Sequence, residues 1–199
     1  MAWPSCPSLI LAFCLVIQSM LAHDTSAQAY QDDFSGLELR LGYARDISAD
    51  PVQEFWKTKS AYSFALATPL FGGIASAGAQ YQPFSGRFDQ YPSFKSTYLS
   101  LAWGYRWHDK NNGIYETGAR LGNFYMVFDD DTFEGVRNES ELAMSLYQSV
   151  KARISGRSYL FIKGTYTRVY TNTRMNLFHI GAGLIVEVRM PKWLKTFLE

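Results

Sequence analysis

The chain of 199 residues is long enough for one domain with a sizeable core, and its formal net charge is only +1. This balance gives no electrostatic sign of nucleic-acid binding, so we expect no nucleic-acid partner. Aromatic residues make up 16% of the chain, a content that suits β-strands and the aromatic belts of membrane proteins.

The first 29 residues have the features of an export signal. Residues 8–20 form an apolar run that is too short to span a membrane as a helix, and residues 27–29 (Ala-Gln-Ala) match a cleavage site. We therefore predict a signal peptide over residues 1–29 and a mature domain over 30–199. The alternative is a short buried or anchoring helix. Both cysteines, Cys6 and Cys14, precede the cleavage site, so the mature chain has no disulfide and no cysteine metal site.

The mature chain contains eight segments in which apolar side chains recur every second residue, the period of a β-strand. In chain order these predicted strands are residues 37–45, 62–70, 74–82, 99–107, 114–127, 142–154, 159–169 and 177–190. The two faces of 159–169 cannot be separated from the sequence. At about 14 residues, the last segment is much longer than an ordinary globular strand. Such a length is typical of a strand that crosses a thick layer.

The connections between these segments alternate in length. Residues 46–59, 83–96 and 129–138 are long and polar, whereas 72–73, 108–113 and 155–157 are short, and 170–176 is intermediate. Consecutive antiparallel strands place alternate connections at the same end of a barrel. Transmembrane barrels have short periplasmic turns and longer outside loops, so we expect the long connections outside and both termini in the periplasm.

Alternation alone does not say which face points outward, because a secreted lipocalin-like carrier also has eight strands around an apolar interior. Strands of about ten residues or more, bulky apolar faces and polar faces that mix small with charged residues favour lipid on the outside. Eight strands leave room for little more than side chains, so interior charges must pair. The predicted lumen charge network comprises Glu38, Arg40, Arg106, Glu116, Arg120, Lys151, Arg153, Glu187 and Arg189. The predicted interface aromatics are Tyr43, Trp103, Tyr105, Trp107 and Trp193.

In strand pattern and loop rhythm, residues 36–190 resemble the small eight-stranded outer-membrane proteins of the OmpA transmembrane domain, OmpX and OmpW type. The resemblance implies an all-β, antiparallel transmembrane barrel in the bacterial outer membrane. It also implies outer-membrane lipid, lipopolysaccharide and the barrel assembly machinery as partners. One departure is the segment 191–199, which follows the last strand. Pro191 is suited to open a short helix that would lie at the membrane interface, and the alternative is a frayed tail.

Candidate chemistry in the mature chain is sparse. His108 lies in a predicted turn, and His179 lies on the polar face of the last strand without a neighbouring serine. A lipid A-modifying hydrolase or acyltransferase would need a nucleophile and a base placed together, so we expect no enzyme and no catalytic residue. The acidic residues 129–131 with Glu134 lack the spacing of a calcium loop, so no metal site and no cofactor are predicted.

The sequence therefore predicts an outer-membrane barrel with a structural or surface-interaction role and a lumen plugged by charges. A narrow solute pore, a lipid-modifying enzyme and a lipocalin-like carrier are the alternatives. If the charge network stabilises the barrel, replacing Arg120 with leucine should lower its resistance to heat in detergent. The surface ligand cannot be read from the sequence.

Overall fold

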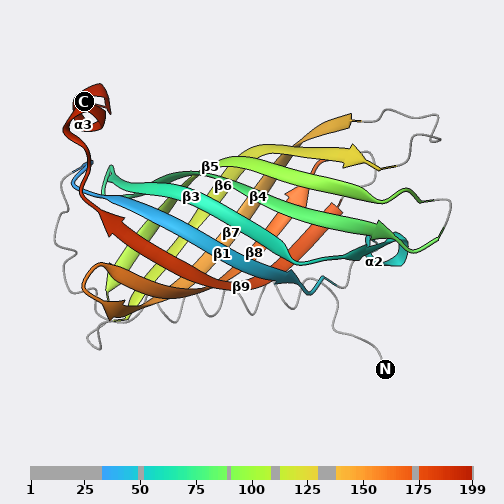
Figure 1. Ribbon diagram of the computed structural model, residues 1–199, viewed down its shortest axis with the longest axis horizontal. Helices are drawn as coiled ribbons and strands as arrows, with labels where there is room; N and C mark the ends of the chain where they lie inside the picture. Colours follow the sequence, from blue (N-terminus) through green and yellow to red (C-terminus); the bar gives the residue numbers. More distant parts are fainter. Residues whose placement is uncertain are drawn as a thin grey trace.

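Eight long antiparallel strands close into a barrel in the computed structural model (Figure 1). The structure describes residues 33–48, 52–88, 91–108, 113–129, 138–171 and 175–198. The predicted signal peptide and most of the acidic connection 129–138 lie outside the described residues. The elements in chain order are β1 (Leu37–Asp46), α2 (Val52–Phe55), β2 (Trp56–Thr58), β3 (Ala61–Leu70), β4 (Gly73–Gly86), β5 (Phe94–His108), β6 (Ile114–Phe128), β7 (Asn138–Ser155), β8 (Ser158–Val169), β9 (Met175–Val188) and α3 (Lys192–Leu198).

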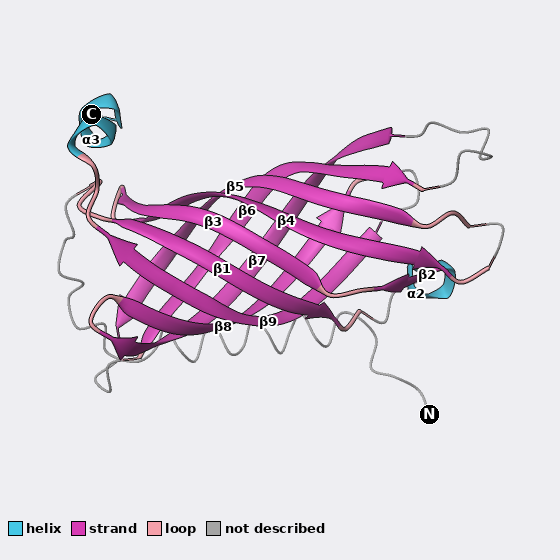
Figure 2. Cartoon of the chain, viewed as in Figure 1, coloured by secondary structure: helices cyan, strands magenta, loops and turns pink. Residues whose placement is uncertain are grey.

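The ring is closed by one pairing that joins strands distant in the sequence. β1 pairs with β9 from Leu37–Val188 to Asp46–His179, and every other long strand pairs with its sequence neighbour. The short strand β2 is an addition that pairs only with the end of β4. Figure 2 shows that strands make up the wall along its whole length, with one short helix near each end. Closure leaves no open sheet edge, which is a condition for crossing a membrane with strands.

The ends of the barrel differ as the connection lengths predict. The tight turn at Phe71–Gly72, the turn at Gly156–Arg157 and helix α3 share one end, which we call the inner end. The longer connections and helix α2 share the other, which we call the outer end. Phe71 and Gly72 both have positive φ values, 52° and 68°, as a two-residue hairpin turn requires.

Several predicted boundaries are wrong at the outer end. Residues 83–86 and 94–96 continue β4 and β5 instead of forming a loop, and Pro83 pairs with Lys95 across the two strands. Pro83 has no amide hydrogen to donate, but its carbonyl accepts a hydrogen bond from the Lys59 amide at 3.0 Å. The connection 46–59 contains α2 and β2, and Asp46 itself ends β1. Composition rich in turn-forming residues predicted a loop, but pairing with neighbouring strands extends the sheet.

Two further predicted positions shift. The last strand covers Met175–Val188 rather than 177–190, so Arg189 lies beyond it, and His108 is the final residue of β5 rather than part of a turn. The structure also separates the faces of β8, because Tyr159, Phe161, Thr165, Thr167 and Val169 are buried while Leu160 and Ile162 are exposed. Odd-numbered residues of β8 therefore face the lumen. Among the described residues, no helix is long and apolar enough to cross a membrane.

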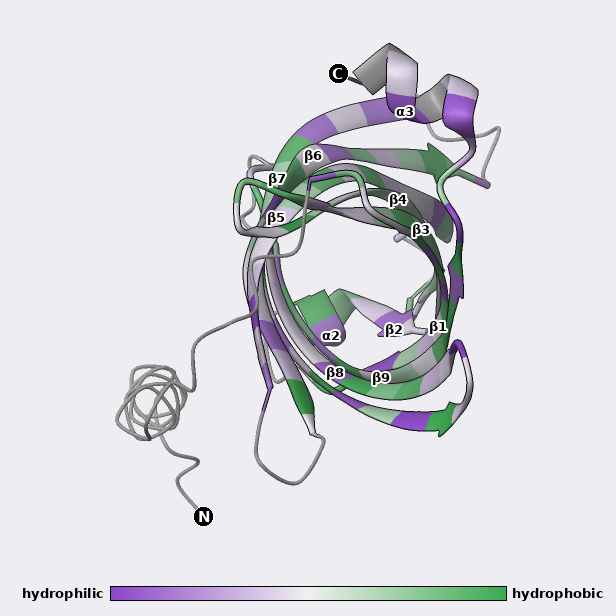
Figure 3. Cartoon of the chain, turned by 90° about the vertical axis from the view of Figure 1, so that its left-hand side faces the viewer, coloured by the Kyte–Doolittle hydropathy of each residue, from purple (hydrophilic) through white to green (hydrophobic). Residues whose placement is uncertain are grey.

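The outer wall of the barrel is apolar around its circumference. Viewed along the barrel, the ring of strands alternates in hydropathy from one residue to the next (Figure 3). Large apolar side chains are exposed on all eight wall strands, and Leu101 in the middle of β5 is 70% exposed. Leu184 and Val186 also face outward, as expected. A continuous apolar band on a closed barrel is stable only against lipid, so this band excludes the lipocalin-like arrangement with its apolar interior.

Candidate functional site

A cluster of five charged side chains fills the lumen toward the inner end. Glu38 and Arg40 come from β1, Arg106 from β5, Glu116 from β6 and Lys151 from β7. We call these residues the inner charge cluster. Their side chains meet because each stands at an inward position of its strand, and the curved wall directs all five toward the same axis. Residues 76 positions apart in the sequence, Arg40 and Glu116, thereby form a direct ion pair.

Glu116 is the centre of the inner charge cluster. Its carboxylate accepts hydrogen bonds from Arg40 Nη1 at 2.7 Å, Arg106 Nη2 at 3.0 Å and Lys151 Nζ at 2.5 Å. The Tyr147 hydroxyl donates a further bond to Glu116 Oε1 at 3.1 Å. No part of the Glu116 side chain is exposed. A buried carboxylate is tolerable only with this density of charged donors, so the cluster is a mutually dependent unit.

Glu38 is the second carboxylate of the cluster. It pairs with Arg40 Nη2 at 2.6 Å and with Arg106 Nη2 at 2.6 Å, while Lys151 Nζ lies 3.6 Å away. Three cations therefore share two carboxylates.

The other residues of the predicted charge network lie outside this cluster. Arg120 faces the lumen but its only described hydrogen bond is to Thr165 Oγ1 at 3.4 Å, with no ion pair. Arg153 is exposed and donates to the Tyr159 hydroxyl at 3.2 Å. Glu187 lies half-buried at the inner mouth, and Arg189 is exposed after the end of β9. Arg120 forms no ion pair with a described carboxylate. An ion-pair network therefore gives no reason to expect lower heat resistance when Arg120 is replaced with leucine.

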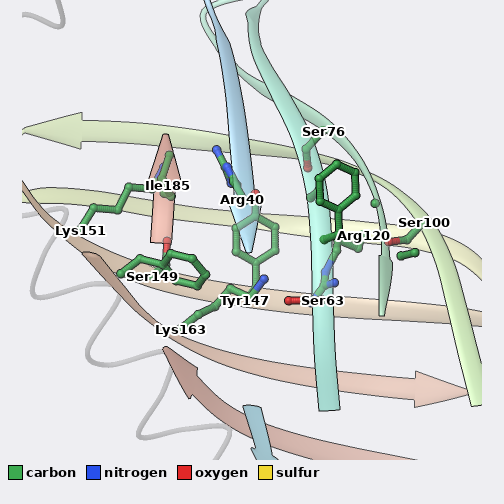
Figure 4. A pocket seen from close by; sticks show the side chains of 15 residues that line it. Arg40, Ser63, Ser76, Ser100, Arg120, Tyr147, Ser149, Lys151, Lys163 and Ile185 are labelled. Carbon is green, nitrogen blue, oxygen red and sulfur yellow. The ribbon is translucent and has the colours of Figure 1, made fainter. Parts of the chain in front are cut away.

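A cavity of about 40 Å³ lies in the lumen beside the inner charge cluster (Figure 4). Its polar lining consists of Arg40, Ser63, Ser76, Ser100, Arg120, Tyr147, Ser149, Lys151 and Lys163. The sequence analysis did not place Lys163 in the lumen, because the two faces of 159–169 could not be separated. Lys163 lies two residues before the buried Thr165 and therefore on the same face of the strand. A volume of this size holds about two or three water-sized particles.

The outer part of the lumen is filled by apolar side chains, which the predicted charge network did not include. We call this group the outer apolar plug; its buried members are Val52, Phe84, Phe94, Tyr98, Phe124, Met126, Ala143, Val169, Met175 and Leu177. Phe84 and Phe94 stack with ring centroids 4.4 Å apart. Val52 belongs to α2, and Figure 3 shows α2 within the outline of the ring. Phe124 and Met126 lie an even number of residues after Glu116 and Arg120 on β6, so the two-residue period places them on the same inward face.

The histidine considered for catalysis has a different environment. His179 is buried in the lumen, and its Nε2 lies 2.8 Å from Gln82 Oε1. The nearby Ser48 hydroxyl donates to Asp46 Oδ1 and accepts a bond from the Phe178 amide at 2.7 Å. His179 therefore contacts an amide rather than a serine nucleophile. In the part of the chain that the structure describes, no group of three or more His, Cys, Asp or Glu side chains is arranged to hold a metal ion.

The predicted interface aromatics all lie on the outer wall or beyond it. Trp103, Tyr105 and Trp107 lie near the C-terminal end of β5, at the inner end of the barrel. The rings of Tyr105 and Trp107 stack with their centroids 6.1 Å apart. Tyr43 lies toward the outer end of β1, where its hydroxyl bonds to Ser60 at 2.7 Å. Trp193 of α3 is 72% exposed. Three of the predicted aromatics therefore lie toward the inner end of the wall, and Tyr43 lies toward its outer end.

Exposed cations gather around the outer end of β4. Lys57 lies opposite Ser85 in the β2–β4 ladder, and Lys95 lies opposite Pro83 in the β4–β5 ladder. Backbone hydrogen bonds hold the other two residues nearby: the Lys59 amide donates to the Pro83 carbonyl, and the Arg87 amide donates to the Phe55 carbonyl. We call Lys57, Lys59, Arg87 and Lys95 the outer basic patch. All four side chains are exposed, and Lys95 Nζ also pairs with Asp129 at 2.7 Å. The patch was not predicted, because its members lie in segments read as separate loops.

No protein-family model and no curated protein sequence matches this chain. Among solved structures, the Neisserial surface protein A (NspA) is similar with a TM-score of 0.57 and 12% identity, covering 75% of this chain and 96% of NspA. The N-terminal β-barrel domain of Pseudomonas aeruginosa OprF gives a TM-score of 0.49 at 10% identity, covering 79% and 100%. Ail, the attachment invasion locus protein of Yersinia pestis, gives 0.46 at 10% identity, covering 76% and 98%. The closed ring, the apolar band and the similarity to NspA lead to the same conclusion: this chain has the fold of the small eight-stranded outer-membrane β-barrels.

Proposed function

We propose that this protein is a closed, non-enzymatic barrel of the bacterial outer membrane that acts through its outer surface. The observation that carries the proposal is the filled lumen. The outer apolar plug closes one part and the inner charge cluster closes the other, and between them the cavity measures only about 40 Å³. A barrel that passes no solute offers its surfaces for interaction, and loops on a rigid scaffold commonly carry binding.

Export and insertion follow from the same proposal. Residues 1–29 act as a cleaved signal peptide, and the barrel assembly machinery then inserts residues 30–199 with the outer end exposed to the exterior. The apolar band and the exposed aromatic side chains toward its two edges support this placement. Helix α3, which carries exposed Lys192, Trp193 and Lys195, supports an interfacial position at the periplasmic leaflet.

The proposal predicts that the purified, refolded protein shows no steady unitary conductance in planar lipid bilayers. The stacked Phe84 and Phe94 rings and the Glu116 ion pairs fill the lumen at two levels, which supports a barrel that does not conduct. The measurement is single-channel recording at high salt, with a general porin in the same bilayer as the positive control. Reproducible unitary steps from the wild-type protein would assign the narrow pore instead.

For the surface partner, we propose the phosphate groups of lipopolysaccharide. The outer basic patch supports this assignment, since four exposed cations stand together at the outer end beyond the apolar band, where the lipid head groups lie. Phosphates of the outer leaflet attract such cations at about 1 kcal/mol each near the surface. The aromatic cluster of Phe55, Trp56 and Tyr91 beside the patch, with ring centroids 4.8–5.8 Å apart, holds α2 and β2 in place.

Replacing Lys57, Lys59 and Arg87 together by alanine should weaken binding to lipid A vesicles about 100-fold, because three attractions of about 1 kcal/mol are lost. The measurement is co-sedimentation of the barrel, held in phosphatidylcholine nanodiscs, with lipid A vesicles, and bisphosphorylated and dephosphorylated lipid A are compared. The matched control replaces Arg189, Lys192 and Lys195, three exposed cations at the opposite end. Equal binding by the patch variant, or no preference for phosphorylated lipid A, would contradict the assignment.

A further inference from the structure

The lumen cavity carries an excess of positive charge that the inner charge cluster does not explain. Four cationic side chains line the cavity, namely Arg40, Arg120, Lys151 and Lys163, and none of its described lining residues is a carboxylate. Arg40 and Lys151 have their partners outside the cavity lining, in Glu38 and Glu116. Arg120 and Lys163 have no ion pair with any described residue. These two cations are the unexplained feature.

The surroundings of Arg120 and Lys163 supply only weak compensation. The Arg120 guanidinium lies 5.8 Å from the Tyr98 ring centroid and 5.9 Å from that of Tyr147, and its Nε has no hydrogen-bond partner. Lys163 Nζ lies 5.5 Å from the Tyr147 ring and 6.0 Å from the Phe161 ring. Contacts with aromatic faces are worth only about 1–2 kcal/mol, far less than the cost of removing a cation from water. A guanidinium also keeps its charge at physiological pH.

The remaining polar groups of the lining are hydrogen-bond donors. Ser63, Ser76, Ser100 and Ser149 line the same cavity, where each hydroxyl group can donate a hydrogen bond (Figure 4). A space that combines hydroxyl donors with two unpaired cations is suited to an anion. Its volume of about 40 Å³ admits a monatomic anion with one or two water molecules, and excludes lipid, sugar and nucleotide phosphates.

We propose that this cavity binds chloride. The anion takes the place of the missing carboxylate, accepting hydrogen bonds from Arg120, Lys163 and serine hydroxyls. It thereby neutralises part of the positive excess inside a wall that lipid surrounds. The site is independent of the outer basic patch and of any surface partner, so neither proposal stands or falls with the other.

The test has two measurements on the refolded full barrel. The first is the thermal unfolding midpoint in detergent at constant ionic strength, with chloride exchanged for gluconate, which is too large for the cavity. The wild-type midpoint should rise with the logarithm of the chloride concentration once this exceeds the dissociation constant, by roughly 3–6 °C at ten times the dissociation constant. Lys163→Met and Arg120→Leu should each abolish this rise. The matched control Lys192→Met, which removes an exposed cation from α3, should retain it.

The second measurement places the anion directly. Crystals of the wild-type barrel grown in bromide should show an anomalous peak in the cavity, within hydrogen-bonding distance of Lys163 Nζ and the Arg120 guanidinium. This measurement decides the matter even if a variant fails to fold. Absence of a bromide peak from the cavity overturns the proposal, as does a chloride-dependent midpoint that is equal in the wild type, Lys163→Met and Arg120→Leu.

Discussion

Replacing Glu116 with glutamine should lower the free energy of unfolding by about 3–5 kcal/mol, the cost of removing one partner from a buried ion pair. The glutamine keeps the shape of the side chain but removes the charge that Arg40, Arg106 and Lys151 share. Three cations are then left with Glu38 as their single carboxylate. The measurement is equilibrium urea unfolding in lipid vesicles, followed by the fraction of protein that migrates as the compact form on a gel without heating.

Glu187→Gln is the matched control for this variant. Glu187 also lies on the inward face of its strand, but it is half-buried at the inner mouth and makes no ion pair with the inner charge cluster. Its replacement should change the free energy of unfolding by less than about 0.5 kcal/mol. If Glu116→Gln unfolds at the same urea concentration as Glu187→Gln and the wild type, the cluster does not stabilise the barrel.

Placing an arginine at Leu101 should cost about 2–4 kcal/mol of unfolding free energy in a bilayer, the penalty for a cation at the midplane. Leu101 is the central residue of β5, and its side chain is 70% exposed on the lipid-facing wall. An arginine there must either lose its hydration or extend far along the wall to reach water. The measurement is the same urea titration in vesicles, because detergent would hydrate the charge and hide the effect.

Thr97→Arg provides the control on the same strand and the same face. It lies four residues nearer the outer end, close to Lys95, whose charge the native barrel already tolerates. An interfacial arginine should cost about 0–1 kcal/mol. Equal costs at Thr97 and Leu101 would show that the two side chains do not lie at different depths in a hydrocarbon layer, and would contradict the membrane placement.

The wall of the barrel could be predicted because its signals are local. Alternation along a strand needs only neighbouring residues, and a two-residue period decides that Leu184 and Val186 share one face while His179 and Glu187 share the other. The alternating connection lengths likewise gave the antiparallel order and the two ends. Errors of boundary occurred where pairing extends strands beyond the apolar band, as at Pro83 and Phe94.

For the lumen, the sequence predicted which charged residues point inward but not how their side chains pair. Alternation placed Glu38, Arg40, Arg106, Glu116 and Lys151 inside, but it could not say that Glu116 would become their common partner. It also gave no warning that Arg120 would form no ion pair with a described residue, or that the outer part of the lumen would be apolar. Lys163 was missed because both faces of β8 carry large side chains over Tyr159–Ile162, so hydropathy alone does not separate them.

The sequence by itself determined the class of fold, the eight strands and, for most strands, which residues share a face, since each depends on a repeat within one strand. Only the tertiary structure decided which charges pair, where the cavity lies and which surface cations gather around β4. Those outcomes depend on the curvature of the closed sheet and on the relative heights of strands far apart in the chain. No local pattern contains either quantity, because both are fixed by closure of the ring as a whole.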